Sequence, residues 1–142
     1  MKILKINSLE KGFCDRDSLL LHAAFQIFVD FVEKEEPEKI IDWSYNSKHR
    51  KTWKEISLLY KWWTKTRPIR KWPLDKKGLK MPPICLENGP DSTCSKTISY
   101  DEKKYEKYKN AMKKAISLDK KWAKEDQGNL YRLIAIRDFL WT

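Results

Sequence analysis

The sequence predicts a mainly α-helical protein, a compact bundle of three to four helices with a long Pro-rich basic connection and at most one short β element. Three observations predict this fold. Apolar residues recur at helical spacing in separate segments, five of the six prolines gather in one stretch, and seven Trp, six Tyr and five Phe can fill a core. A chain of 142 residues can bury a sizeable core as one domain, which we expect to cover 1–142.

The first predicted helix covers residues 15–35, and residues 1–6 before it favour a short edge strand. Asp15 or Asp17 suits the helix start, and Pro37 follows its end. Apolar side chains nearly encircle this helix, as in the centre of a domain or an oligomer interface. One polar stripe recurs every four residues and contains Ser18, His22, Gln26 and Asp30. The stripe is either the solvent side of a buried helix or a polar seam that lines a ligand site.

The second predicted helix covers residues 47–65, is capped by Asn46 or Ser47, and ends before an Arg-Pro pair. Four apolar residues at steps of three and four form one buried stripe: Trp53, Ile56, Tyr60 and Trp63. Leu58 and Trp62 point elsewhere and are surrounded by lysines. That second patch is either a contact with another helix or an exposed aromatic surface.

Residues 66–98 lose helical periodicity and are predicted to form a long irregular connection. Five prolines fall in it: Pro68, Pro73, Pro82, Pro83 and Pro90. Its first half is basic. Connections of this length are uncommon in compact domains unless they are functional or disordered.

Two further helices are predicted, over residues 100–126 and 128–140. Ser99 and Glu102 have the spacing of a capping box, and Gly128 interrupts the apolar pattern, so that the helix bends there or a new one begins. The inner face of the first of these helices is apolar and its outer face carries lysines.

The formal net charge of +10 favours polyanions as partners, although lysine-rich helices are also often just solvated. Three cysteines without a CxxC pair indicate reduced thiols. The first residues do not have the pattern of a signal peptide, and the longest apolar run is too short and polar to span a bilayer. We therefore expect a soluble intracellular protein that does not insert into membranes.

Enzymatic chemistry is poorly supported, and we expect no catalytic residue, cofactor or metal site. The sequence has two histidines and none of the common nucleophile, phosphate-loop, zinc or dinucleotide motifs. Cys14 at a helix start, beside Arg16, is the best nucleophile, but Asp15 and Asp17 oppose a lowered thiol pKa. Helix capping explains the same two carboxylates more simply than a cation site does.

Binding is better supported, by the segment RPIRKWP at 67–73. Its guanidinium groups suit phosphate, and its indole can stack on a base. The alternative is a solvated basic loop whose Trp72 folds onto the core. The predicted ligand-binding residues are Arg67, Arg70, Lys71, Trp72 and Trp62, with Arg16, His22 and Gln26 adding specificity.

Several motifs together resemble a family of small accessory proteins of tailed phages. They are GFCDRD at 12–17, LLHA at 20–23, FQ at 25–26, VDFVEKE at 29–35, IDW at 41–43, WKEI at 53–56, YKWW at 60–63, RP at 67–68, EDQ at 125–127, NL at 129–130, RLI at 132–134, IR at 136–137 and LWT at 140–142. The resemblance covers most of the chain except residues 78–98. It implies a phage protein in the cytoplasm of a host bacterium, and because the family has no established activity it transfers no functional residues.

Our first hypothesis is a non-enzymatic binder of a phosphorylated nucleotide-type ligand, acting as a counter-defence sponge for an immune signal. The alternatives are a sequence-nonspecific nucleic-acid-binding protein and an inhibitor that docks on a host protein. An enzyme that uses Cys14 is the weakest alternative. The surplus of apolar residues in helix 15–35 also favours a homo-oligomer.

Overall fold

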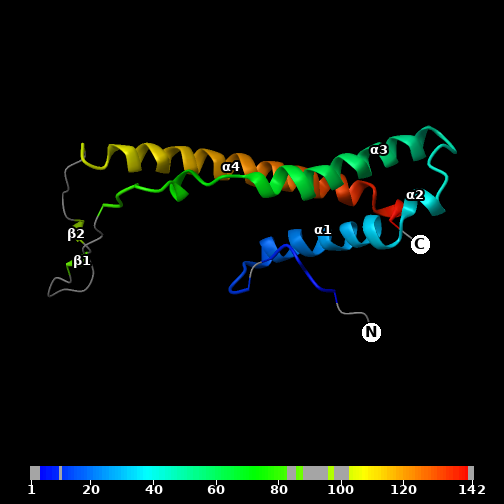
Figure 1. Cartoon of the computed structure of the whole chain (residues 1–142), viewed down its shortest axis with the longest axis horizontal. Coiled ribbons are helices and arrows are strands. Elements are labelled where there is room, and N and C mark those ends of the chain that lie inside the picture. Colours follow the sequence, from blue (N-terminus) through cyan, green and yellow to red (C-terminus); the bar gives the residue numbers. More distant parts are fainter. Residues whose placement is uncertain (1–3, 10, 83–85, 88–95, 98–102, 141–142) are drawn as a thin grey trace. The chain divides into compact units, whose positions relative to one another are not determined.

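The computed structural model describes residues 4–9, 11–82, 86–87, 96–97 and 103–140, and it confirms a mainly α-helical fold. The elements are α1 (Arg16–Lys34), α2 (Pro37–Ile40), α3 (Ser47–Lys61), β1 (Leu86–Glu87), β2 (Lys96–Thr97) and α4 (Glu106–Ala135) (Figure 1). The two strands pair antiparallel, with Leu86 opposite Thr97. No described helix combines the length and the apolar character that a membrane span requires.

The chain divides into two compact units. Unit 1 contains residues 1–70 and 123–142, and unit 2 contains residues 71–122. Helix α4 contributes its C-terminal turns to unit 1 and its N-terminal turns to unit 2. The single domain expected over 1–142 stays a prediction.

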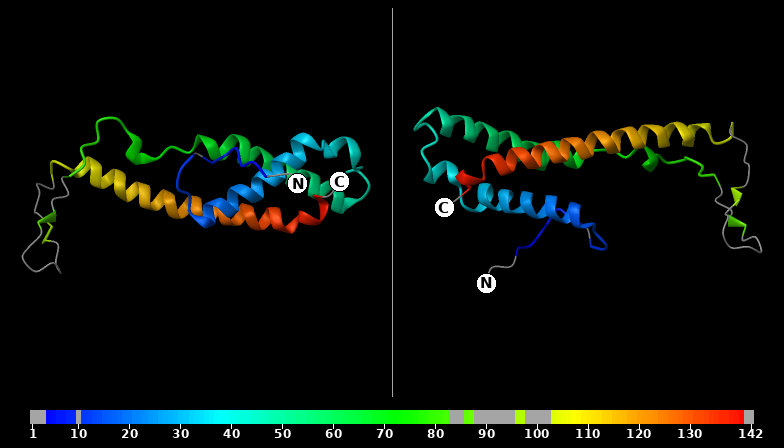
Figure 2. Two further views of the ribbon diagram at one scale, coloured as in Figure 1. Left: turned by 90° about the horizontal axis from the view of Figure 1, so that it is seen from below. Right: turned by 180° about the vertical axis from the view of Figure 1, so that it is seen from behind.

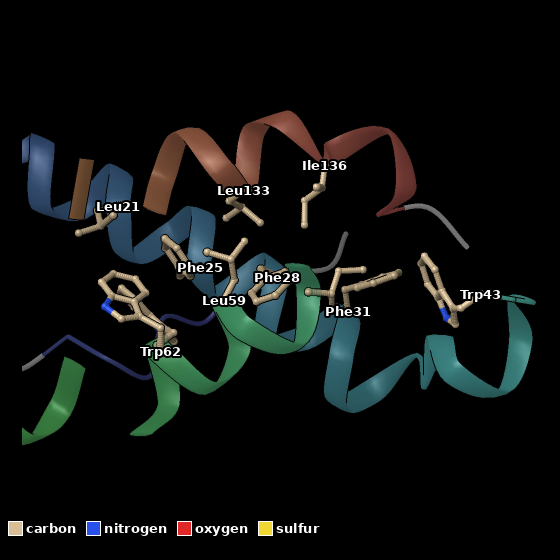
Figure 3. Packing of buried hydrophobic residues seen from close by; sticks show 11 residues of the cluster. Leu21, Phe25, Phe28, Phe31, Trp43, Leu59, Trp62, Leu133 and Ile136 are labelled. Carbon is tan, nitrogen blue, oxygen red and sulfur yellow. The ribbon is translucent and has the colours of Figure 1, made fainter. Parts of the chain in front are cut away.

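The core of unit 1 lies where α1, α3 and the C-terminal turns of α4 come together (Figures 1 and 2). Phe25 and Phe28 of α1 and Leu59 of α3 are fully buried, and Leu133 of α4 packs against them (Figure 3). Burying side chains of this size contributes about 1.5–3 kcal/mol each. Apolar residues at helical spacing therefore hold unit 1 together.

Helix α1 confirms the predicted helix at 15–35, with ends that differ by one residue. Asp15 occupies the N-cap position without a side-chain cap, and Asp17 accepts a hydrogen bond from the backbone amide of Ser18 at 2.8 Å. The helix ends before Glu36, whose left-handed φ of 46° separates α1 from Pro37, the first residue of α2. The short strand expected at 1–6 is absent from the described residues 4–6.

Helix α3 begins as predicted, because the Asn46 side chain accepts a hydrogen bond from the backbone amide of His49 at 2.9 Å. It ends earlier than the predicted helix at 47–65. A π-helical turn covers Trp62–Thr66 and a 3-10 turn covers Arg67–Ile69. The wider turn inserts an extra residue into the helical spacing, so Trp62 and Trp63 both become buried.

The described part of the predicted connection at 66–98 is irregular from residue 70 to 82, apart from a 3-10 turn at Pro73–Asp75. Its remainder contains β1 and β2, which supply the short β element, although away from the N-terminal position expected from the sequence. Residues 83–85, 88–95 and 98 of this prediction lie outside the described residues.

Helix α4 corrects the prediction of two helices at 100–126 and 128–140. The helix is continuous from Glu106 to Ala135, and residues 137–139 form a 3-10 turn. Gly128 lies within the helix because one glycine costs only about 1 kcal/mol there, which the packing of the flanking Leu133 and Ile136 offsets. The predicted start at 100–102 lies outside the described residues.

Candidate nucleic-acid interface

Four of the predicted ligand residues lie in unit 1, near the part of α4 that begins at residue 123. They are Trp62, Arg67, Arg70 and His22. The π-helical turn and the following 3-10 turn present the two arginines to Glu125 and Asp126 of α4. Their pairing decides whether the guanidinium groups are available to a ligand.

Asp126 holds both guanidinium groups. Arg67 donates from Nη2 to Asp126 Oδ2 at 3.0 Å and from Nε to both carboxylate oxygens at 3.3 Å. Arg70 donates from Nη2 to Asp126 Oδ1 at 2.7 Å, and the same nitrogen lies 3.2 Å from Glu125 Oε2. The side chains of Arg67, Arg70 and Asp126 are only 23%, 16% and 17% exposed. These charges are therefore neutralised within the protein.

The two indoles of the π-helical turn are also used internally. Trp62 donates from Nε1 to Glu125 at 2.6 Å, and Trp63 stacks on Phe25 with ring centroids 4.3 Å apart. The Arg67 guanidinium lies over the Trp63 ring at 4.7 Å, a cation–π contact. Both indoles are less than 9% exposed, so neither offers a face to a nucleobase.

Two residues of the polar stripe of α1, His22 and Gln26, are buried against other parts of unit 1, whereas Ser18 is exposed. His22 is buried, with Nδ1 2.7 Å from Ser8 Oγ and its ring edge against Trp63. Burial lowers the pKa of His22, and the nearby Arg67 lowers it further, while Asp126 opposes this shift. Gln26 accepts from the backbone amide of Asn7 at 3.0 Å and donates to Asp30 at 2.9 Å.

These contacts correct the predicted phosphate site. Arg67 and Arg70 are paired with carboxylates, Trp62 is buried, and His22 and Gln26 bind residues of the segment before α1. Arg16 lies exposed in the first turn of α1. Lys71 and Trp72 belong to unit 2, where Lys71 is exposed and Trp72 is partly buried.

A groove of about 650 Å³ in unit 1 is lined by residues of α3, the π-helical turn and α4, and four of its polar residues already have partners within the protein. Glu125 binds Trp62 and Arg70, Asn129 accepts from Arg132 at 2.7 Å, and Arg132 pairs with Glu55. A ligand there would have to displace these internal hydrogen bonds. The groove is therefore a weak candidate site.

Unit 2 concentrates unpaired positive charge on one side of α4. We call this surface the lysine face, and it consists of Lys107, Lys113, Lys114, Lys120 and Lys121. At 3.6 residues per turn these five positions occupy roughly 140° of the helix circumference. All five side chains are exposed, and within the described residues none of them forms an ion pair.

The charge count of the sequence agrees with this location. Residues 71–122 carry 13 Lys and Arg against 7 Asp and Glu, and the other 90 residues carry 17 against 13. The surpluses of 6 and 4 give the total of +10, so the shorter segment holds the larger share. Residues 71–122 therefore carry the larger net positive charge for their length.

The opposite side of α4 in unit 2 packs against the segment after residue 70. Trp72 contacts Trp122 with ring centroids 5.8 Å apart, and both Pro73 and Ala115 are buried. Beside Trp72 lies a pocket of about 310 Å³, lined by Met112, Ala115, Ile116, Asp119 and Lys120. Packing on the apolar side leaves the lysine face to solvent.

The sequence had marked the lysines as the outer face of this helix without assigning them as site residues. Spacings of seven residues, as in Lys107, Lys114 and Lys121, were the available signal, since such positions nearly align along a helix. Few acidic residues lie close to Arg67 and Arg70 in the sequence. No local pattern therefore indicated that these arginines pair with Glu125 and Asp126.

No protein-family model matches the chain, and comparisons with curated proteins and with solved structures also find no match.

Replacing Asp126 with Asn should strongly destabilise unit 1, because two largely buried guanidinium groups would lose their charged partner. Removing one member of a buried pair costs about 3–5 kcal/mol, and we expect the lower end because Asp126 is 17% exposed. Urea denaturation measures the loss. Asp138→Asn is the matched control, since the pair of Asp138 with Arg137 is exposed; equal effects of both variants would contradict the role of Asp126.

Acidification below about pH 6.5 should destabilise the protein through His22. Because the pKa of His22 is lowered in the folded state, the unfolded chain takes up the proton first, so the free energy of unfolding falls as pH decreases. The loss ends once pH passes below the folded-state pKa. We expect His22→Asn to flatten the stability difference measured between pH 7.5 and pH 5.5, and an unchanged difference would exclude His22 as its source.

Proposed function

We propose that this protein binds nucleic acid without reading its sequence, through the lysine face of α4. The observation that carries the proposal is the gathering of five exposed lysines on one side of a helix, unpaired within the described residues. Ammonium groups in such rows attract phosphates and release the counterions that surround them. A rigid helix keeps these charges at fixed spacing, which favours a repeating polyanion over a single phosphate.

The lysine face contacts backbone phosphates and not base edges. Lysine acts as a point charge without the planar fork by which arginine reads guanine, and the face is formed mainly by lysines, with the exposed Asn110 among them. Phosphate contacts position a protein but carry no sequence information. This chemistry supports binding that depends on charge and helix geometry alone.

The free-nucleotide hypothesis loses three of the residues on which it depended, because Arg67, Arg70 and Trp62 are bound within unit 1. A counter-defence role, docking on a host protein, a homo-oligomer, a phage origin and a location in the host cytoplasm stay predictions from the sequence. A nucleic-acid-binding accessory protein is compatible with each of them.

Replacing Lys107, Lys114 and Lys121 with Gln should weaken nucleic-acid binding and its salt dependence together. Glutamine keeps helix propensity close to that of lysine, so the change removes charge with little effect on α4. Loss of three phosphate contacts should make the slope of log affinity against log salt shallower by about 2–3. Fluorescence anisotropy with a labelled duplex at several salt concentrations measures this slope.

The matched control replaces the exposed Lys51, Lys54 and Lys65 of unit 1 with Gln, which lowers the net charge by the same amount. We expect this control variant to keep most of the slope of log affinity against log salt that the unmodified protein shows. Equal losses in both triple variants would show that binding follows net charge alone, and no binding by the unmodified protein at low salt would refute the proposed function.

A further inference from the structure

The pocket beside Trp72 joins an apolar interior to a charged rim. Met112, Ala115 and Ile116 line it with apolar groups, Trp72 contributes an indole, and Asp119 and Lys120 contribute charge. Its volume of about 310 Å³ is at the small end of the range for ligand pockets. A pocket of this size and composition suits one flat aromatic group.

The Trp72 ring is held in place by its neighbours in unit 2. It precedes Pro73, whose ring is buried and whose φ is fixed, and its carbonyl accepts from the amide of Asp75 at 3.1 Å. The ring also contacts Trp122. Little side-chain freedom is therefore left to lose when a ligand stacks on this indole.

Lys120 belongs both to the pocket and to the lysine face. A strand whose phosphates lie along Lys113 and Lys120, which are about 10.5 Å apart along the helix axis, would pass the mouth of the pocket. Charge thus brings a nucleic-acid strand to a site that fits one base.

We propose that the pocket lined by Trp72, Met112, Ala115, Ile116, Asp119 and Lys120 receives one unstacked nucleobase, and that the protein therefore prefers single-stranded nucleic acid to duplex. The inference rests on the proposed function of the lysine face. Bases within a duplex are stacked and paired and cannot enter such a pocket without first being extruded. Stacking of one base on an aromatic side chain contributes about 1–3 kcal/mol, a preference of about five- to 150-fold.

The test measures the affinities of single-stranded and duplex DNA of equal length at one salt concentration. The unmodified protein should favour the single strand, and Trp72→Leu should bring the ratio of the two affinities close to one. Trp72→Phe keeps an aromatic ring and should retain most of the preference. Circular dichroism of each variant verifies that α4 is still folded.

A measurement on the unmodified protein avoids any effect of substitution on folding. A single strand with several abasic positions keeps its phosphates but lacks bases there, so it should bind more weakly than the intact strand with the same salt slope. Equal affinity for intact and abasic strands, or no preference for single strands over duplex, would overturn the base pocket. Either result would leave charge-driven binding intact, whereas absence of all binding would refute the proposed function itself.

Discussion

The pairing of Arg67 and Arg70 with Glu125 and Asp126 determines which positive charges of this protein are left for a partner. The four side chains join the turn after α3 to α4 and place the Trp62 and Trp63 rings under the two guanidinium groups. Since the arginines are satisfied inside unit 1, a partner must use other cations. The lysines of α4 in unit 2 form one exposed group of such charges on a single element.

Much of the fold could be predicted because it follows from local patterns. Phe25, Phe28 and Phe31 recur at steps of three, which identifies α1, and Asn46 supplies the cap of α3. The π-helical turn at Trp62–Thr66 could not be predicted, because no local pattern marks it and the burial of two adjacent indoles is visible only in the tertiary structure. Gly128 was misleading for the same reason, since packing of α4 outweighs the low helix propensity of one glycine.

The candidate site was harder to predict from sequence than the fold. Basic and aromatic residues at 67–73 have the composition of a phosphate site, but the carboxylate that neutralises Arg67, that of Asp126, is 59 residues away in the sequence. Composition cannot reveal a partner at that distance. The lysine face, by contrast, was visible in the helical spacing of the sequence. A solvated helix has the same pattern. Only the absence of ion pairs to these lysines among the described residues favours a binding surface.

Charge, aromatic packing and helix geometry combine in unit 2 in a way that unit 1 does not repeat. There the apolar side of α4 is covered by the segment that contains Trp72, and the opposite side keeps its lysines exposed. Unit 1 uses Arg67, Arg70, His22 and its buried indoles to stabilise its own packing. The two units therefore differ in what their basic residues do, although both are rich in them.

Lysine acetylation, measured by mass spectrometry with and without a bound oligonucleotide, tests the location of the interface most directly. The account predicts that Lys107, Lys113, Lys114, Lys120 and Lys121 become protected from acetylation, while the exposed Lys51, Lys54 and Lys65 of unit 1 react as before. Protection confined to unit 1, or spread evenly over all exposed lysines, would contradict it.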